Sequence, residues 1–184
     1  MRLFLAVPLP PVIADRAAAC LPPPLPGLRP VRPDQLHITL AFLGQVADDR
    51  LGPAIEAAGA AVRGRAAFGV LLDHAGRFPP GGRPRAVWLG IGAGVEELIS
   101  LAADVARELR QRAFALEDRP FSPHVTLARV RPDTTSPGSR TIATAIETLT
   151  VPELRLTVDR ITVVESRLSP GGPQYTARAV VPLS

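Results

Sequence analysis

Apolar and polar residues alternate along the chain with two different periods, and each period predicts one kind of element. Where apolar residues recur three or four positions apart, we expect amphipathic helices, over 11–21, 48–62, 95–114 and 141–149. Short β-branched and aliphatic runs between turn-forming residues predict strands over 2–8, 36–43, 68–72, 86–91, 124–130, 154–158, 160–165 and 175–180. The proline-rich segment 22–33 and the polar segment 132–139 are expected to be loops.

This order of elements predicts an α+β fold in a single domain over residues 1–184. Strands and helices alternate in two similar halves, so we expect two related, pseudo-symmetric lobes. Each lobe would be a small, mostly antiparallel sheet with its helices outside. The two lobes would face each other across a central cleft.

Two of the three histidines open the same four-residue pattern: histidine, an aliphatic residue, threonine and leucine. The first copy covers 37–40 and the second covers 124–127, in different halves of the 184-residue chain. Because alternate side chains of a strand point to opposite faces, each histidine shares a face with the threonine of its own copy. Two such strands facing each other would bring two imidazoles and two hydroxyls together, and paired imidazoles can act as general base and general acid. The candidate catalytic residues are His37 and His124, with Thr39 and Thr126 beside them.

The basic residues, 21 against 17 acidic ones, are all arginine, since the chain contains no lysine. The missing lysine excludes a P-loop lysine, a Schiff base and the lysyl-adenylate of nucleotide-dependent ligases. Codon usage in a GC-rich genome accounts for most of the arginines. The net charge of +4 permits a phosphate-bearing or nucleic-acid partner without requiring one.

The single cysteine, the N-terminal segment and the spacing of the histidines indicate the compartment of the protein and whether it binds a metal. The one cysteine, Cys20, cannot form an internal disulfide, which is consistent with a reducing cytoplasm. Residues 1–7 are too short an apolar run for a signal peptide or a membrane span, so we expect a soluble, cytoplasmic protein without a membrane partner. None of the three histidines has a second ligand at metal-binding spacing, so no metal site is expected. A monomer is the default for a chain of this size.

The paired tetrads resemble those of the 2H phosphoesterases, a superfamily defined by two His-x-Thr motifs. Within it, the chain resembles the RNA 2′,3′-cyclic phosphodiesterases of bacteria and archaea, also called the 2′-5′ RNA ligase family. The segment 166–173, Ser-Arg-Leu-Ser-Pro-Gly-Gly-Pro, points to this branch. The family often has a basic residue where Ala41 stands, outside the tetrad. The resemblance spans nearly the whole chain and rests on residues 2–7, 36–44, 84–90, 119–129 and 165–175.

The resemblance implies hydrolysis of a ribose 2′,3′-cyclic phosphate at an RNA end to a 2′-phosphate, without a metal or another cofactor. The sequence leaves the natural substrate open among tRNA halves or fragments, short oligonucleotides, a mononucleotide cyclic phosphate and a cyclic ADP-ribose phosphate. Water attacks phosphorus while the ribose 3′ oxygen leaves, so one ring takes a proton and the other gives one. The resemblance favours His124 as base and His37 as acid, although the sequence itself leaves their order open. Thr39 and Thr126 would donate hydrogen bonds to the non-bridging oxygens.

Arg129 is a further candidate for phosphate binding, because the family motif continues to an arginine there. It lies five positions after His124, so an ideal strand would place it on the opposite face, and only a bulge or bend could redirect it. Phe121 is a candidate for stacking on a base, with core packing as the favoured alternative. Trp88 and Tyr175 are expected to pack, and His74, which lacks a threonine partner, to be structural or exposed.

Two other functions remain open. The first is ATP-independent 2′-5′ RNA ligation, in which a 2′,3′-cyclic phosphate end is joined reversibly to a 5′-hydroxyl end by the same residues. The second is a non-catalytic module that binds RNA ends. The presence of both histidines and both threonines favours catalysis over binding alone.

Overall fold

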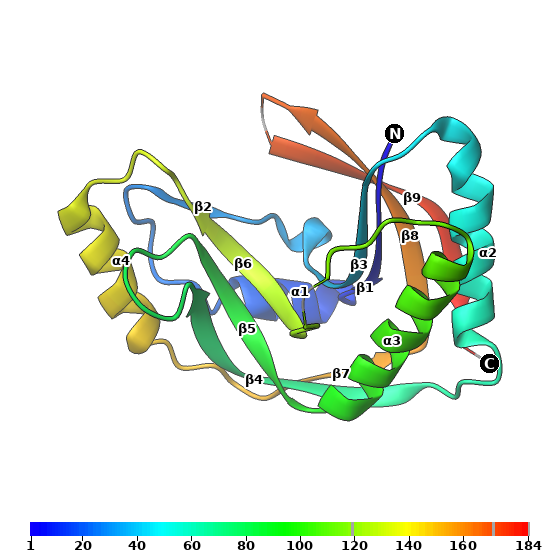
Figure 1. Cartoon of the computed structure of the whole chain (residues 1–184). Coiled ribbons are helices and arrows are strands. Elements are labelled where there is room, and N and C mark those ends of the chain that lie inside the picture. The colour runs from blue at the N-terminus through cyan, green and yellow to red at the C-terminus, as the bar shows by residue number, and fades with distance from the viewer. Residues whose placement is uncertain (119, 171, 184) are drawn as a thin grey trace.

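The computed structural model describes residues 1–118, 120–170 and 172–183 and has the expected α+β architecture (Figure 1). Its helices are α1 (Pro11–Ala18), α2 (Leu51–Val62), α3 (Val95–Gln111) and α4 (Ser136–Glu147), with 3₁₀ turns η1 (Pro33–Gln35) and η2 (Asp48–Arg50). Its strands are β1 (Arg2–Pro8), β2 (Leu28–Pro30), β3 (His37–Gln45), β4 (Phe68–Phe78), β5 (Ala86–Ala93), β6 (His124–Val130), β7 (Leu154–Val158), β8 (Arg160–Ser169) and β9 (Gly172–Pro182). Arg119 and Gly171, which belong to two stretches that carry the resemblance, lie outside the described residues.

Over the described residues the strands form one curled antiparallel sheet in the order β7-β4-β5-β6-β3-β1-β8-β9, and β2 pairs with β6. Strand β6 meets β3 at one residue pair, Ile38 with Val125, whereas β5–β6 and β1–β3 pair over several residues. This pair joins two halves of the sheet. One half contains β7, β4, β5, β6 and β2, and the other contains β3, β1, β8 and β9 (Figure 1).

Aliphatic side chains from one face of the sheet form the core under the helices. Helices α2 and α3 pack against each other; α3 also contacts β3, α2 contacts β8 and β9, and α4 packs against β4. Leu5, Ile38 and Val125 are completely buried in the main core, and Val87 lies in a smaller core with Ile142 of α4. The side chains that alternate with these residues lie on the opposite face. We call that face, which carries His37, Thr39, His124 and Thr126, the inner face.

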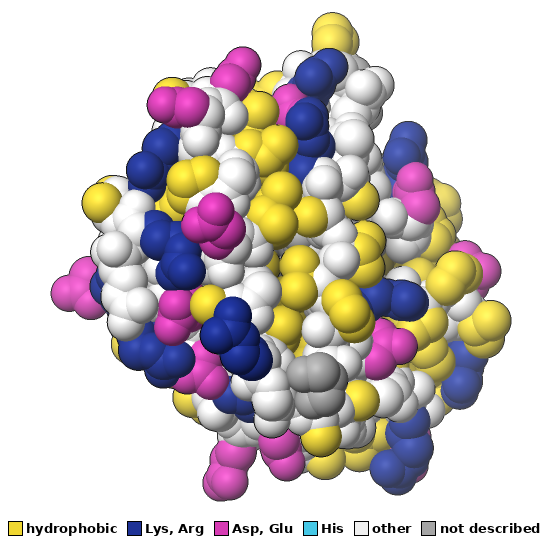
Figure 2. All heavy atoms as spheres, turned by 90° about the vertical axis from the view of Figure 1, so that its right-hand side faces the viewer, with side chains coloured by type: hydrophobic (Ala, Val, Ile, Leu, Met, Phe, Trp, Pro, Cys, Tyr) yellow, Lys and Arg dark blue, Asp and Glu magenta, His cyan; other side chains and the backbone are white. Residues whose placement is uncertain are grey.

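The outer side formed by α2 and α3 carries interspersed arginine and acidic side chains around an apolar strip, and no histidine appears on it (Figure 2). Ion pairs such as Arg65 with Asp104 and Arg112 with Glu108 lie along these helices. Charge on this side is therefore largely balanced locally. Each helix of the described chain is too short or too polar to cross a membrane.

The expected loop over 132–139 is wrong in its second half, because α4 begins at Ser136. The hydroxyl of Thr135 accepts a hydrogen bond from the Gly138 amide, and a proline lies in the first turn. A threonine cap and an N-terminal proline are helix-start signals, and here they outweigh the polarity of the segment.

The strands also differ from the expectation, and two of these differences lie beside the candidate site. The proline-rich segment 22–33 contains β2, which adds to the edge of β6 and could not be recognised from three residues. Strand β4 continues beyond residue 72 to Phe78. The polar pair Asp73 and His74 interrupts its apolar pattern, and the structure explains the interruption by an irregularity in strand pairing at this point.

Candidate active site

His37 and His124 occupy matching positions, each as the first residue of its strand next to the pair that joins the two halves. The Nδ1 atom of each ring lies close to the backbone carbonyl oxygen two residues earlier. The distances are 2.6 Å to Gln35 and 2.8 Å to Ser122. A carbonyl can only accept, so Nδ1 carries the proton and donates. Each neutral ring is thereby held in the tautomer in which Nε2 is the unprotonated nitrogen.

Aromatic rings from neighbouring strands pack against both imidazoles. His37 lies 5.0 Å from the ring centroid of Phe4 and 5.6 Å from that of Tyr175. His124 lies 5.0 Å from Phe78 and 6.3 Å from Trp88. Tyr175 and Trp88 therefore do pack, but they pack against the two candidate catalytic rings and orient them.

Two other sequence-predicted groups, Arg129 and His124, affect the pKa of His37. Burial lowers the pKa of His37, and the charges of Arg129 and His124 lower it further, while the hydrogen bond to Gln35 works in the opposite direction. The ordinary pKa of histidine is about 6.5, so the His37 ring is predominantly neutral near pH 7. A neutral ring with Nε2 unprotonated is ready to accept a proton.

Thr39 and Thr126 lie two residues after the histidines, and both are half-buried. Thr126 is in register with Trp88, and Thr39 with Ala6. Regular strand alternation between each histidine and its threonine puts all four side chains on the inner face.

Strand β6 contains an extra residue that redirects Arg129. Trp88 of β5 pairs with Thr126, but Val87 already pairs with Ala128, so Leu127 and Ala128 together face one position of β5. Both are fully buried, whereas Arg129 is exposed. This is the arrangement of a β-bulge, which shifts the alternation by one residue. It returns Arg129 to the inner face, five positions after His124.

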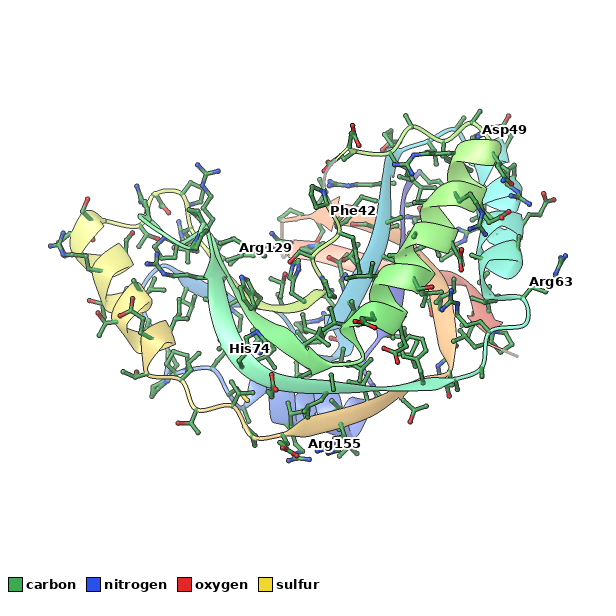
Figure 3. All side chains as sticks on the ribbon, turned by 60° about the horizontal axis from the view of Figure 1, so that its bottom comes forward. Phe42, Asp49, Arg63, His74, Arg129 and Arg155 are labelled. Carbon is green, nitrogen blue, oxygen red and sulfur yellow. The ribbon has the colours of Figure 1, made fainter. Side chains whose placement is uncertain are left out.

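Strand β3 has the same irregularity at the same place in its tetrad. Leu5 of β1 pairs with Ala41, and the next residue of β1 pairs with Thr39, so Leu40 is the extra residue. The redirected side chain here is Phe42, 41% exposed, whose ring lies 5.7 Å from that of Phe4. Because Phe4 also contacts His37, Phe42 lies on the inner face. Figure 3 shows Phe42 and Arg129 on strands β3 and β6, on the two sides of the junction between the halves.

Sequence reasoning missed Phe42 and named Phe121 as the aromatic candidate. Phe121 is half-buried and packs against the main core. The signal for Phe42 was available, because it occupies the same place after its tetrad as Arg129 does after the other.

His74 also lies on the inner face, together with Asp73. Leu72 pairs with Ile91 and His74 with Gly90, so Asp73 is an extra residue in β4. The two side chains occupy space left by missing Cβ atoms, because a Cβ at Gly90 would overlap the His74 ring and one at Gly92 would overlap the Asp73 carboxylate. The Asp73 carboxylate contacts His74 Nδ1 at 2.6 Å.

A separate cavity and the distribution of metal-binding side chains were the other candidates for a site in the described residues. A cavity of about 590 Å³ among β1, α1, β4 and β7 is lined by none of these candidate residues. Among the described residues, no group of three or more histidine, cysteine, aspartate or glutamate side chains is arranged to hold a metal ion. The inner face is therefore where the side chains capable of proton transfer and anion binding come together.

Comparisons with known proteins agree over the length of the chain. A family model described as the 2'-5' RNA ligase superfamily matches residues 10–169. The RNA 2',3'-cyclic phosphodiesterase of Thermus thermophilus is 35% identical over an alignment of 191 positions, gaps included. The alignment covers 96% of this chain and 87% of that protein. The Escherichia coli protein of the same name is 38% identical over 134 residues, covering 70% and 71%.

Solved structures show the same fold. The Thermus thermophilus protein TT0787 aligns with a TM-score of 0.80 and 30% identity, over 100% of this chain and 98% of that one. Escherichia coli LigT complexed with 3'-AMP aligns with a TM-score of 0.76 and 31% identity, again over 100% and 98%.

Proposed function

The chain belongs to the 2'-5' RNA ligase superfamily, and we propose that it hydrolyses 2′,3′-cyclic phosphate ends of RNA to 2′-phosphomonoesters. One observation carries the proposal: two imidazoles lie on one face at the junction of the two halves, each held through Nδ1 by a backbone carbonyl, and the charges of Arg129 and His124 act on His37. The cyclic phosphodiesterase names of its relatives support the same reaction.

The reaction is an in-line displacement at phosphorus that needs two proton transfers. The oxygen of water forms a bond to phosphorus while the bond from phosphorus to the ribose 3′ oxygen breaks. One imidazole accepts the proton of water through Nε2, and the other, protonated, gives its Nε2 proton to the 3′ oxygen. Protons and charge then balance within the protein, and we propose that the step requires no metal ion.

Three further side chains would stabilise the phosphate in this step. Thr39 and Thr126 would donate hydrogen bonds to the non-bridging oxygens, where negative charge accumulates. Arg129 would neutralise part of that charge, since a guanidinium binds phosphate through two parallel N–H groups. The bulge in β6 supports this role because it directs Arg129 to the face of His124.

The lowered pKa of His37 favours His37 as base and His124 as acid, the reverse of the order that the resemblance implies. A substrate in which sulfur replaces the bridging 3′ oxygen decides between the two orders, because a thiolate leaves without needing a proton. The variant that lacks the acid should recover activity on this substrate. If His124→Ala recovers and His37→Ala does not, His37 is the base; the opposite result assigns the base to His124.

The main test uses an oligoribonucleotide that ends in a 2′,3′-cyclic phosphate, in the presence of EDTA. Wild-type protein should convert it to a 2′-phosphate, and His37→Ala and His124→Ala should not. His74→Ala removes the remaining histidine as a matched control and should stay active. If the wild-type protein does not convert the substrate even without EDTA, the proposed reaction is wrong. If EDTA abolishes the conversion and added metal restores it, the proposed metal independence is wrong.

Ligation is a second candidate, because the matching family model is described as a ligase superfamily. The same two proton transfers would serve if a 5′-hydroxyl replaced water as the nucleophile. Adding an RNA with a 5′-hydroxyl end to the same assay separates the two reactions by product length. A joined product as the main outcome would make ligation the principal activity.

A further inference from the structure

Arg29 and Arg129 stand directly opposite each other on neighbouring strands. In the pairing of β2 with β6, Leu28 is in register with Val130, Arg29 with Arg129 and Pro30 with Ala128. Both arginines are exposed. Side chains of directly opposite residues have Cβ atoms about 5 Å apart, and like charges in such a pair repel. An anion bound between them would remove this repulsion.

Arg29 lies on the same face as the candidate active site. Leu28 packs against the smaller core, and its partner Val130 is buried there too. Alternation then places Arg29 on the other face, next to Arg129, whose charge acts on His37. On the edge of β6 opposite β5, β3 pairs with β6 only at Val125, and β2 pairs with the same edge further along, at residues 128–130. Arg29 therefore continues the row of site residues outward, one strand beyond Arg129.

Two neighbouring arginines, Arg32 and Arg131, each pair with an aspartate. Arg32 pairs with Asp34 at 2.7 Å, and Arg131 pairs with Asp133 at 2.8 Å. Within the described chain, neither Arg29 nor Arg129 forms a hydrogen bond or an ion pair with an acidic side chain. Asp133 is close enough for Arg29 to help lower its pKa, but Arg131 has the larger effect and holds that carboxylate through two hydrogen bonds.

We propose that Arg29 binds the phosphodiester group that precedes the terminal nucleotide of the RNA. This inference rests on the proposed function, in which Arg129 binds the reacting cyclic phosphate. Two guanidinium groups side by side fit two successive phosphates of one strand, each bound through a fork of N–H donors. Arg29 thereby makes the enzyme prefer RNA ends over free nucleoside cyclic phosphates, which have no second phosphate.

The test compares Arg29→Gln with wild type on three substrates that share the same terminal nucleoside 2′,3′-cyclic phosphate. These are the free nucleoside cyclic phosphate, a dinucleotide and an oligoribonucleotide. Loss of one charge-assisted contact should lower kcat/KM about tenfold on the dinucleotide and the oligoribonucleotide. Activity on the free nucleoside cyclic phosphate should stay unchanged. Arg63→Gln is the matched control, because Arg63 is exposed at the end of α2 and extends into solvent far from Arg129 (Figure 3).

A binding measurement keeps this test independent of catalysis. Fluorescence anisotropy with a labelled oligoribonucleotide that ends in a 2′-phosphate should show weaker binding for Arg29→Gln. The slope of log affinity against log salt should fall by about 0.7, the value for one phosphate contact on a single strand. Equal losses on all three substrates, or no loss of oligonucleotide binding, would overturn the role of Arg29. Failure of wild type to hydrolyse any cyclic phosphate would instead overturn the proposed function, and the binding result would still decide about Arg29.

Discussion

His37 and His124 are held in the same way but have different neighbours. Each begins a strand, each donates from Nδ1 to a carbonyl two residues earlier, and each strand has an extra residue at the leucine of its tetrad. Beyond that residue, β3 presents Phe42 to the inner face, and β6 presents Arg129.

A repeated backbone could thereby serve the asymmetric reaction proposed above. The shared geometry puts two imidazoles and two hydroxyls in equivalent places. The residue after each bulge then makes the two sides unequal, because only β6 brings a positive charge. The proposed base and acid need different environments, and Arg129 contributes to that difference by lowering the pKa of His37.

Replacing either histidine should have the largest effect on activity, since each is expected to carry one proton transfer. His37→Ala and His124→Ala should each lower kcat by about 10²- to 10⁴-fold. Steady-state kinetics on a nucleoside 2′,3′-cyclic phosphate measure this. Similar losses would indicate that each imidazole carries one proton transfer. If one of the two variants keeps the wild-type kcat, a single imidazole suffices.

Replacing Arg129 tests the side of the comparison that carries charge. Arg129→Gln should lower kcat by about 10²-fold, as expected for loss of a donor to developing negative charge. Arg129→Lys should recover only part of the rate, because lysine lacks the planar fork. A loss confined to KM would contradict a role in the transition state.

The same variant should change the pH profile of kcat/KM. If His37 is the base, kcat/KM falls at low pH as His37 becomes protonated. Because the pKa of His37 is lowered, this fall lies on the acidic side of about pH 6.5. Arg129→Gln removes a positive charge that disfavours protonation, so the pKa of His37 rises and this fall moves to higher pH. A fall at unchanged pH would show that it belongs to a different group.

Replacing the two threonines should have intermediate and similar effects. Thr39→Val and Thr126→Val keep the shape of the side chain but remove the hydroxyl, and each should lower kcat by about tenfold. Serine at either position should retain most of the rate. A strong effect at only one threonine would break the equivalence of the two halves in phosphate binding.

Replacing Phe42 should have the smallest effect. Its ring is exposed on the inner face, and an aromatic side chain there offers a surface on which a base can stack. Phe42→Ala should raise KM for an oligoribonucleotide about fivefold, with kcat unchanged. Phe121→Ala is the comparison, and a larger rise in KM there would restore the sequence-based candidate.

The tetrads and their strands could be predicted from the sequence, because period-two alternation is visible in single residues. The bulges could not be predicted in the same way. Leu127 and Ala128 are both apolar, so nothing in the pattern shows that both face the core, and an ideal strand would turn Arg129 away from His124. The position of Arg129 depends on how β5 pairs with β6, which is a tertiary property.

Other features of the site were missed for related reasons. The polar pair Asp73–His74 ended the predicted strand early, although the strand continues through it. Arg29 lies in a segment that was expected to be a loop, so the sequence did not show that it pairs with Arg129 across two strands. In each case the missing information is which strand lies alongside.

The single residue pair between β3 and β6 also has a consequence for the spacing of the two histidines. The ladder between the two halves of the described sheet narrows to Ile38 and Val125, and side chains of both halves meet in the main core behind this pair. One candidate catalytic ring lies on each side of it, directly before the paired residue. The separation of the two candidate proton-transferring nitrogens therefore depends on how the two halves of the sheet meet at this one pair.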